Sequence, residues 1–261
     1  MNTEVISLVF SIPTYKRVKD LKRLICSIQC SATLAGEGIK VTLLIRDNDS
    51  ESLITAKEIK SYVPDINVIY IKNKMNEGAR ANTWRALVKS SDFGDYVILA
   101  SDDDYILPDF IPTISSHLRS FKTDYLVTNY YIQDASLNAS YKQQGLQKSV
   151  LPNLIDCPKA DIILSNRILT GTCYSSNLVK YMDELCEESF YIKQWYVQFI
   201  GCFSSYYHRI DSRLSIHQVY NQTYWEGMDN NRYEDIVVSR LKGYEHAYSI
   251  TNGSSEELWH L

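Results

Sequence analysis

The sequence lacks several features that mark common functional classes. No apolar stretch approaches the length of a membrane span, and the N-terminal residues lack the basic region of a signal peptide. Lysine and arginine total 27 against 31 aspartates and glutamates, which leaves a formal net charge of -4. Because broad nucleic-acid binding needs a basic surface, this charge balance argues against a nucleic-acid partner.

Cysteine spacing excludes two further classes. The six cysteines form neither a CxxC pair nor a Cys/His zinc pattern, so we expect reduced thiols in a cytoplasmic protein. The chain also has no internal repeat and no linker, and its 261 residues are long enough to bury a substantial core. We therefore expect one domain over residues 1–261, with functional halves at 1–120 and 121–261.

The first hundred residues alternate between strand and helix patterns. Apolar runs predict strands over 5–12, 41–45, 66–71 and 96–100, and helical patterns fall between them near 21–28, 54–62 and 78–90. Such alternation is typical of an α/β protein with a mostly parallel, Rossmann-like sheet flanked by helices.

The second half is less regular. Strands are predicted over 124–130 and 168–174, with short strands near Tyr206 and Leu214, and helices over 161–166, 178–186, 190–203 and 234–248. The polar segment 132–158 predicts a long loop, and 221–231 predicts another.

Three consecutive carboxylates, Asp102, Asp103 and Asp104, follow the strand predicted over 96–100. Adjacent carboxylates repel one another, and a hard divalent cation with oxygen ligands, such as Mn²⁺ or Mg²⁺, relieves that repulsion. Such a cation usually completes its shell with substrate phosphates. The alternative is a solvated acidic turn.

Polar residues follow the other predicted strands as well. They are Thr14 to Arg17, Asp47 to Ser50, and Asn73 to Gly78. Because open α/β sheets bind ligands at the carboxyl ends of their strands, this clustering predicts a nucleotide site.

These motifs together resemble family 2 glycosyltransferases of the GT-A fold. The resemblance rests on Pro13-Thr14-Tyr15-Lys16-Arg17, on Asp47-Asn48-Asp49-Ser50, on Asn76, Gly78, Asn82 and Arg85-Ala86, and on the Asp triplet with Pro108. It covers about the first 120 residues and is strongest toward abequosyltransferase-like O-antigen and capsule enzymes. Many members read D-x-D-D before that proline, whereas here Ser101 stands at the first of those aspartates.

The resemblance implies roles for individual residues. It places Asp102 near the ribose, makes Asp103 a metal ligand, and has Asp104 either assist as a second metal ligand or hold the loop. Asp47 would recognise the nucleobase, unless it is an ordinary turn aspartate bonded to backbone amides. Further nucleotide contacts would come from Pro13, Thr14, Tyr15, Arg17, Asn76, Gly78, Asn82 and Arg85. The alternative is that Arg17 is a solvated residue of the first helical turn and that Arg85 forms a surface salt bridge. Asn76 and Gly78 would then simply form the turn before the helix.

The second half must supply the catalytic base, since a base has to stand across the anomeric carbon from the diphosphate. The resemblance points to a carboxylate before a helix, and Glu188 and Glu187 fit, with Glu184 and Asp183 as competitors. The alternative is that they are first-turn acids favoured by the helix dipole. His217 is a candidate third metal ligand, or a structural histidine.

The resulting prediction is an inverting, metal-dependent glycosyltransferase. It would move a sugar from a nucleoside diphosphate sugar to a glycan acceptor, itself lipid-linked, at the inner face of the membrane during synthesis of a bacterial surface polysaccharide. A nucleotidyltransferase acting on sugar phosphates is an alternative, but the loop after the first strand lacks that class's glycines. A catalytically silent sugar- or nucleotide-binding relative is the other.

Overall fold

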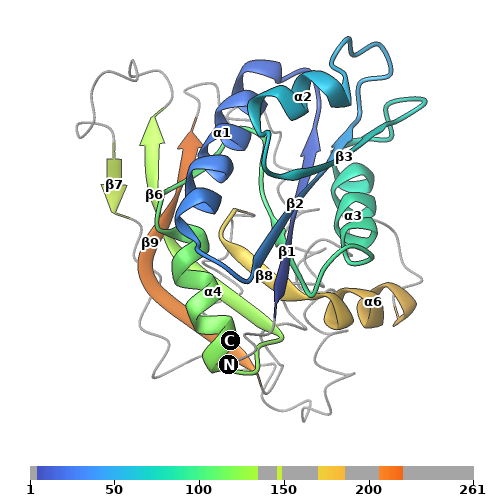
Figure 1. The fold of residues 1–261 in the computed structure, drawn as a ribbon. Helices are drawn as coiled ribbons and strands as arrows, with labels where there is room; N and C mark the ends of the chain where they lie inside the picture. The colour runs from blue at the N-terminus through green and yellow to red at the C-terminus, as the bar shows by residue number, and fades with distance from the viewer. Residues whose placement is uncertain (1–4, 135–145, 149–169, 186–205, 220–261) are drawn as a thin grey trace, which may run out of the picture.

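The structure, a computed structural model, describes residues 5–134, 146–148, 170–185 and 206–219 (Figure 1). The helices are α1 (Val18–Leu34), α2 (Ala56–Tyr62), α3 (Ala79–Ser90), α4 (Phe110–Ser120) and α6 (Ser176–Leu185). The strands are β1 (Ile6–Thr14), β2 (Ile39–Asp47), β3 (Asn67–Lys72), β4 (Tyr96–Leu99), β5 (Tyr105–Ile106), β6 (Tyr125–Asp134), β7 (Leu146–Lys148), β8 (Thr172–Ser175) and β9 (Tyr207–Val219).

All these strands belong to one sheet in the order β3-β2-β1-β4-β8-β6-β9-β5, with β7 paired to β6. The four strands β3, β2, β1 and β4 are parallel, which confirms the predicted α/β architecture with a largely parallel sheet. The neighbours of β8 and the pair β5–β9 are antiparallel, and β6 and β9 run parallel.

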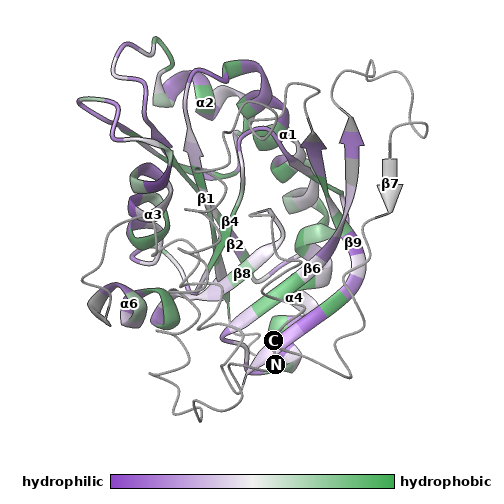
Figure 2. Ribbon diagram, turned by 180° about the vertical axis from the view of Figure 1, so that it is seen from behind, coloured by the Kyte–Doolittle hydropathy of each residue, from purple (hydrophilic) through white to green (hydrophobic). Residues whose placement is uncertain are grey.

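Helices cover both faces of the sheet because its central strands are apolar on both sides. Leu8, Phe10 and Ile12 of β1 pack in a core that includes residues of α1 and α4, whereas Val9 packs with Ala86 of α3 on the opposite face. In Figure 2 the middle of the sheet is accordingly the most hydrophobic part of the ribbon, with α3 and α6 on the near side. No helix within the described residues is both long and apolar enough to cross a membrane.

The second half differs from the prediction in two places. The segments near Tyr206 and Leu214 form one continuous strand, β9, because an irregularity in its pairing with β6 accommodates the exposed residues Asp211 and Ser212. The predicted loop 132–158 contains the end of β6 and all of β7.

Several predicted elements lie outside the described residues, namely the helices over 161–166, 190–203 and 234–248 and the loop over 221–231. The single domain over 1–261 also stays a prediction.

Candidate functional site

A cavity of about 340 Å³ opens where the parallel strands end. The register of β1 and β2 sets Thr14 beside Asp47, and β4 ends next to them on the other side of β1. The cavity is lined by Pro13, Thr14, Tyr15, Arg17, Asn48, Ala79, Asn82, Thr83, Ser101 and Asp102. Of the predicted nucleotide-binding residues, it therefore collects Pro13, Thr14, Tyr15, Arg17, Asn82 and Asp102.

Asp102 is buried in the wall of this cavity. Its Oδ2 accepts a 2.8 Å hydrogen bond from the Thr14 hydroxyl, and its Oδ1 lies 3.1 Å from Arg17 Nη1. Burial raises the pKa of Asp102 to about 6, with the charge of Asp103 adding to the rise, although the Thr14 hydrogen bond and Arg17 oppose it. Burial therefore makes the ionised form of Asp102 unfavourable, and a nearby cation would stabilise that form.

This pKa gives a pH-dependent stability. An aspartate whose pKa is higher in the folded than in the unfolded chain binds protons preferentially when folded, so its contribution is fully present below about pH 4. That contribution is lost as pH rises through about 6, and its size is about 3 kcal/mol. Denaturant unfolding in a chelating buffer should therefore show wild type losing stability relative to Asp102→Asn across this range. A pH-independent difference would contradict the assignment.

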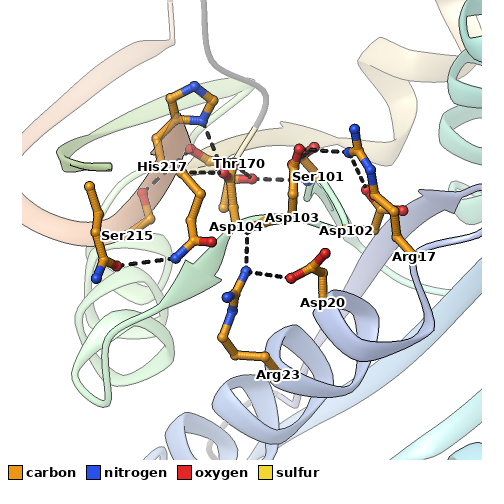
Figure 3. Close-up of polar contacts among 12 residues, drawn as sticks. Arg17, Asp20, Arg23, Ser101, Asp102, Asp103, Asp104, Thr170, Ser215 and His217 are labelled. Atoms are coloured by element: carbon orange, nitrogen blue, oxygen red, sulfur yellow. Dashed lines mark hydrogen bonds and ion pairs between the residues drawn. The ribbon is translucent and has the colours of Figure 1, made fainter. Parts of the chain in front are cut away.

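Asp103 follows Asp102 and contacts the same arginine. Its Oδ2 lies 2.6 Å from Arg17 Nη1, and its other oxygen accepts a hydrogen bond from the Ser101 hydroxyl. Arg23 of α1 donates a 2.6 Å hydrogen bond to the Asp103 carbonyl, which fixes the backbone of the triplet. Figure 3 shows one guanidinium meeting both carboxylates.

Asp104 is fully buried, and the second half of the chain holds it. Its Oδ2 accepts a hydrogen bond from the Thr170 hydroxyl at 2.6 Å. Its Oδ1 accepts a hydrogen bond from the backbone N–H of Gln218 and faces His217 Nδ1 at 2.9 Å. Thr170 also accepts a hydrogen bond from the Ser101 amide, so it bridges both ends of the triplet loop. Such contacts are those of a residue that holds a loop, and metal ligation by Asp104 stays a prediction.

His217 approaches the triplet from the side opposite Arg17 (Figure 3). Burial lowers the pKa of His217, but the hydrogen bond to Asp104 and the charges of Asp104 and Asp103 outweigh burial and raise it overall. Because Nδ1 faces Asp104, the other ring nitrogen is the one that can face a metal.

Gly171 makes this arrangement possible beneath the loop. Its backbone has φ +100, and an added Cβ would lie 2.6 Å from Thr128 Oγ1. Gly171→Ala should therefore lower the free energy of unfolding by about 2–4 kcal/mol, through backbone strain plus overpacking. Gly36→Ala is the matched control, because Gly36 has φ +74 but no atom within 4 Å of an added Cβ. Equal losses in the two variants would rule out the packing contribution.

Asp47 lies behind the cavity wall and is 2% exposed. Its Oδ2 accepts a 2.7 Å hydrogen bond from the Tyr70 hydroxyl, and its Oδ1 accepts from the Asp49 amide at 2.9 Å. Burial and this bond to Asp47 raise the pKa of Tyr70 to about 12. The contact with Asp49 is the turn interaction considered as the alternative role, and nucleobase recognition by Asp47 stays a prediction.

A network of asparagine amides shapes the far wall of the cavity. Asn48 Oδ1 accepts from Asn73 and from the Glu77 amide, each at 2.9 Å, while its own amide donates to Asn76 Oδ1 at 2.7 Å. Asn73 also donates to Asn82 Oδ1 at 2.9 Å. The predicted residue Asn76 therefore supports the cavity through Asn48. Gly78, with φ 83, is the residue before α3, and the first residue of that helix, Ala79, lines the cavity.

Arg85 is placed away from the Asp triplet. It pairs with Glu77, which also pairs with Arg46 at 3.0 Å, and it lines a second hollow on the α3 side of the sheet. Asp183 of α6 lines the same hollow and accepts a 2.9 Å hydrogen bond from the Trp84 indole. Of the other candidate bases, Glu184 lies on α6 and its side chain is not described, while Glu187 and Glu188 lie outside the described residues.

Some functional residues were not found by sequence reasoning. Asn48 and Ser101 lie within motifs already noted, but the roles that those motifs imply belong to the neighbouring aspartates. Thr170 and Gln218 carry no local signal, because their importance arises only from β-sheet pairing that brings residues about 66 and 114 positions away onto Asp104.

The sequence profile described as "Glycosyl transferase family 2" matches residues 10–180, which is more than half of the chain. The chain belongs to glycosyl transferase family 2. The matched region includes the second half of β1, the Asp triplet and Thr170. Family membership favours glycosyl transfer over the nucleotidyl transfer considered as an alternative.

Solved structures support the GT-A fold of this family 2 member. S. aureus TarS 1-349 in complex with UDP-GlcNAc superposes with a TM-score of 0.66 at 14% identity, over 95% of this chain and 70% of that one. Glucosyl-3-phosphoglycerate synthase from Mycobacterium tuberculosis, in complex with Mg²⁺ and UDP, gives 0.55 at 16% identity, over 93% and 80%. No curated protein sequence matches the chain significantly.

Proposed function

We propose that this family 2 glycosyltransferase takes its sugar from a nucleoside diphosphate sugar and transfers it, with inversion, to a hydroxyl of a glycan acceptor. The observation that carries the proposal is the meeting of two carboxylates at Arg17, a residue that lines the strand-end cavity together with Asp102. Asp102 and Asp103 converge on a single nitrogen of Arg17, within 3.1 and 2.6 Å.

This geometry fits a divalent cation. Two carboxylates from different residues already face one positive group, which stands where a cation would be held. Within the described part of the chain, no three His, Cys, Asp or Glu side chains gather closely enough to hold a metal alone. The cation would therefore have few protein ligands, with Asp103 first. His217 stays a candidate ligand whose ring Asp104 orients, but it lies on the side of the triplet opposite Arg17 and would have to turn to reach a cation at the Arg17 position. Mn²⁺ or Mg²⁺ bound there would neutralise the charge of the leaving diphosphate.

The remaining cavity residues would position the nucleotide. Thr14 fixes the Asp102 carboxylate, which would face the ribose, while Tyr15 and Asn82 line the surface along which the nucleotide lies. The start of α3 at Ala79 adds backbone N–H groups of a helix N-terminus, which favour negatively charged ligand groups. TarS and the synthase were solved with UDP-GlcNAc and with UDP, which supports a nucleotide sugar as donor here.

We further propose that the acceptor is a lipid-linked glycan, met at the inner face of the membrane during synthesis of a bacterial surface polysaccharide. The resemblance to O-antigen and capsule enzymes supports this assignment. The unpaired Cys26, Cys30 and Cys173 suit a reducing, cytoplasmic setting. Comparing turnover of a lipid-linked acceptor with that of its water-soluble analogue tests it, and equal efficiency would contradict membrane contact.

A thermal-shift screen tests the donor and the metal together. Nucleoside diphosphates are added singly, each with Mn²⁺ and with EDTA. In the presence of Mn²⁺, one of these nucleotides at about 100 times its own Kd should raise the Tm of the protein by about 5 °C or more, because a ligand that binds only the native state stabilises it. Stabilisation that is equal in EDTA would contradict metal dependence, and no response to any diphosphate would contradict the donor class. Donor hydrolysis that stops on chelation would exclude a catalytically silent relative.

A further inference from the structure

Arg17 reaches the Asp triplet through an unusual backbone turn. The preceding residue, Lys16, has φ 57, and no other non-glycine residue with positive φ occurs in the described segments. Left-handed backbone costs about 1–2 kcal/mol for a residue with a Cβ, so the turn needs compensation from its surroundings. The turn carries Arg17, the residue before α1, to the triplet loop about 85 positions further along the chain.

One guanidinium nitrogen then serves two carboxylates. Arg17 Nη1 lies 3.1 Å from Asp102 Oδ1 and 2.6 Å from Asp103 Oδ2. The carboxylates are largely buried, with 7% and 14% of their side chains exposed, whereas 48% of the Arg17 side chain is exposed. The cation therefore closes the acidic pair from the solvent side, and it can turn away without unpacking the core.

We propose that Arg17 is a resident counter-cation that occupies the metal position until the donor and its metal arrive together. This inference rests on the proposed function, because it places a donor-bound divalent ion, held first by Asp103, where the Arg17 guanidinium now stands. The incoming metal takes over Asp103 and displaces the guanidinium. The displaced Arg17 already lines the nucleotide cavity, so it pairs with the donor diphosphate instead.

The exchange couples metal binding to nucleotide binding. A metal ion alone must break the two ion pairs that Arg17 makes with Asp102 and Asp103. A metal ion that arrives with a diphosphate supplies a new anionic partner for the displaced guanidinium, so each ligand strengthens the binding of the other. Arg17 would thereby keep the acidic pair from binding metal unproductively when no donor is present.

Mn²⁺ titration followed by the electron paramagnetic resonance signal of the free ion tests the inference without measuring turnover. Wild type should bind Mn²⁺ weakly alone and much more tightly with UDP. Arg17→Ala should bind Mn²⁺ alone about tenfold more tightly than wild type, because no resident cation competes. The same variant should bind UDP more weakly at saturating Mn²⁺. A purely structural role for Arg17 would weaken both.

Two further variants separate charge from position. Arg17→Lys keeps a cation on the turn and should stay near wild type for Mn²⁺ alone. Arg119→Ala removes one positive charge at the exposed end of α4, where Arg119 donates to the Glu37 carbonyl, and should leave Mn²⁺ binding unchanged. Equal Mn²⁺ affinity in wild type and Arg17→Ala would overturn the inference while leaving the proposed function intact. Absence of Mn²⁺ binding in both, with and without UDP, would overturn the inference together with the proposed metal dependence.

Discussion

Asp103→Asn is expected to lower sugar transfer by about 10²-fold or more while the protein stays folded. The substitution keeps the shape of the side chain but removes the charge that would hold the metal, and Lewis-acid stabilisation of a leaving group amounts to several kcal/mol. It also removes a like charge beside Asp102, so a large loss of stability is not expected. Release of nucleoside diphosphate in the presence of donor and acceptor measures the effect.

A matched variant close by in the sequence, beyond β5, is Asp109→Asn. Asp109 is the residue before α4, and its side chain makes no capping hydrogen bond there, so this variant should keep wild-type activity. Thermal melting of both variants separates a folding defect from a chemical one. Wild-type transfer by Asp103→Asn at unchanged metal dependence would remove Asp103 from the metal site.

The second large effect is expected from Glu188→Gln. Glutamine keeps the size and hydrogen-bonding capacity of the side chain but cannot accept the proton of the acceptor hydroxyl, so transfer should fall by about 10²–10⁴-fold. Nucleotide affinity should stay near wild type, because the base stands across the anomeric carbon from the diphosphate. Single-turnover transfer and nucleotide titration on the same preparation measure the two quantities.

The competing carboxylates are not equivalent. Asp183 accepts a hydrogen bond from the Trp84 indole and lines the hollow on the α3 side, which shares no lining residue with the strand-end cavity. Asp183→Asn is therefore the control in this series, and it should transfer sugar at the wild-type rate. Normal transfer by Glu188→Gln would assign the base elsewhere, and Glu187→Gln and Glu184→Gln would follow.

The sequence predicted the parallel part of the fold well because its strands are short apolar runs buried on both faces. Val9 and Phe10, adjacent in β1, pack on opposite sides of the sheet, which is why the strand reads as a continuous apolar run there. The same logic placed Thr14, Asp47 and Asp102 at neighbouring strand ends.

The sequence did not predict which of the polar side chains at the strand ends line the cavity and which bond to other residues of the protein. Asp47 and Asn82 stand in equally plausible motifs, yet Asp47 is buried against Tyr70 whereas Asn82 reaches the cavity. Arg85 lies on α3, as Asn82 does, but it pairs with Glu77 and does not line the cavity. Such choices depend on packing between elements, and long-range pairs such as Thr170 with Asp104 leave no local pattern.

The bridge made by Thr170 and the contacts of His217 and Gln218 also bear on how this protein can be recombined with its relatives. The loop that would bind the donor is fastened by residues from the half that would bind the acceptor. The two halves are therefore not interchangeable modules, and a chimera joined near residue 120 would inherit an acidic loop without its fastenings. Donor and acceptor preferences would have to change together, and Thr170, His217 and Gln218 would have to be kept with Asp104, the aspartate that they hold.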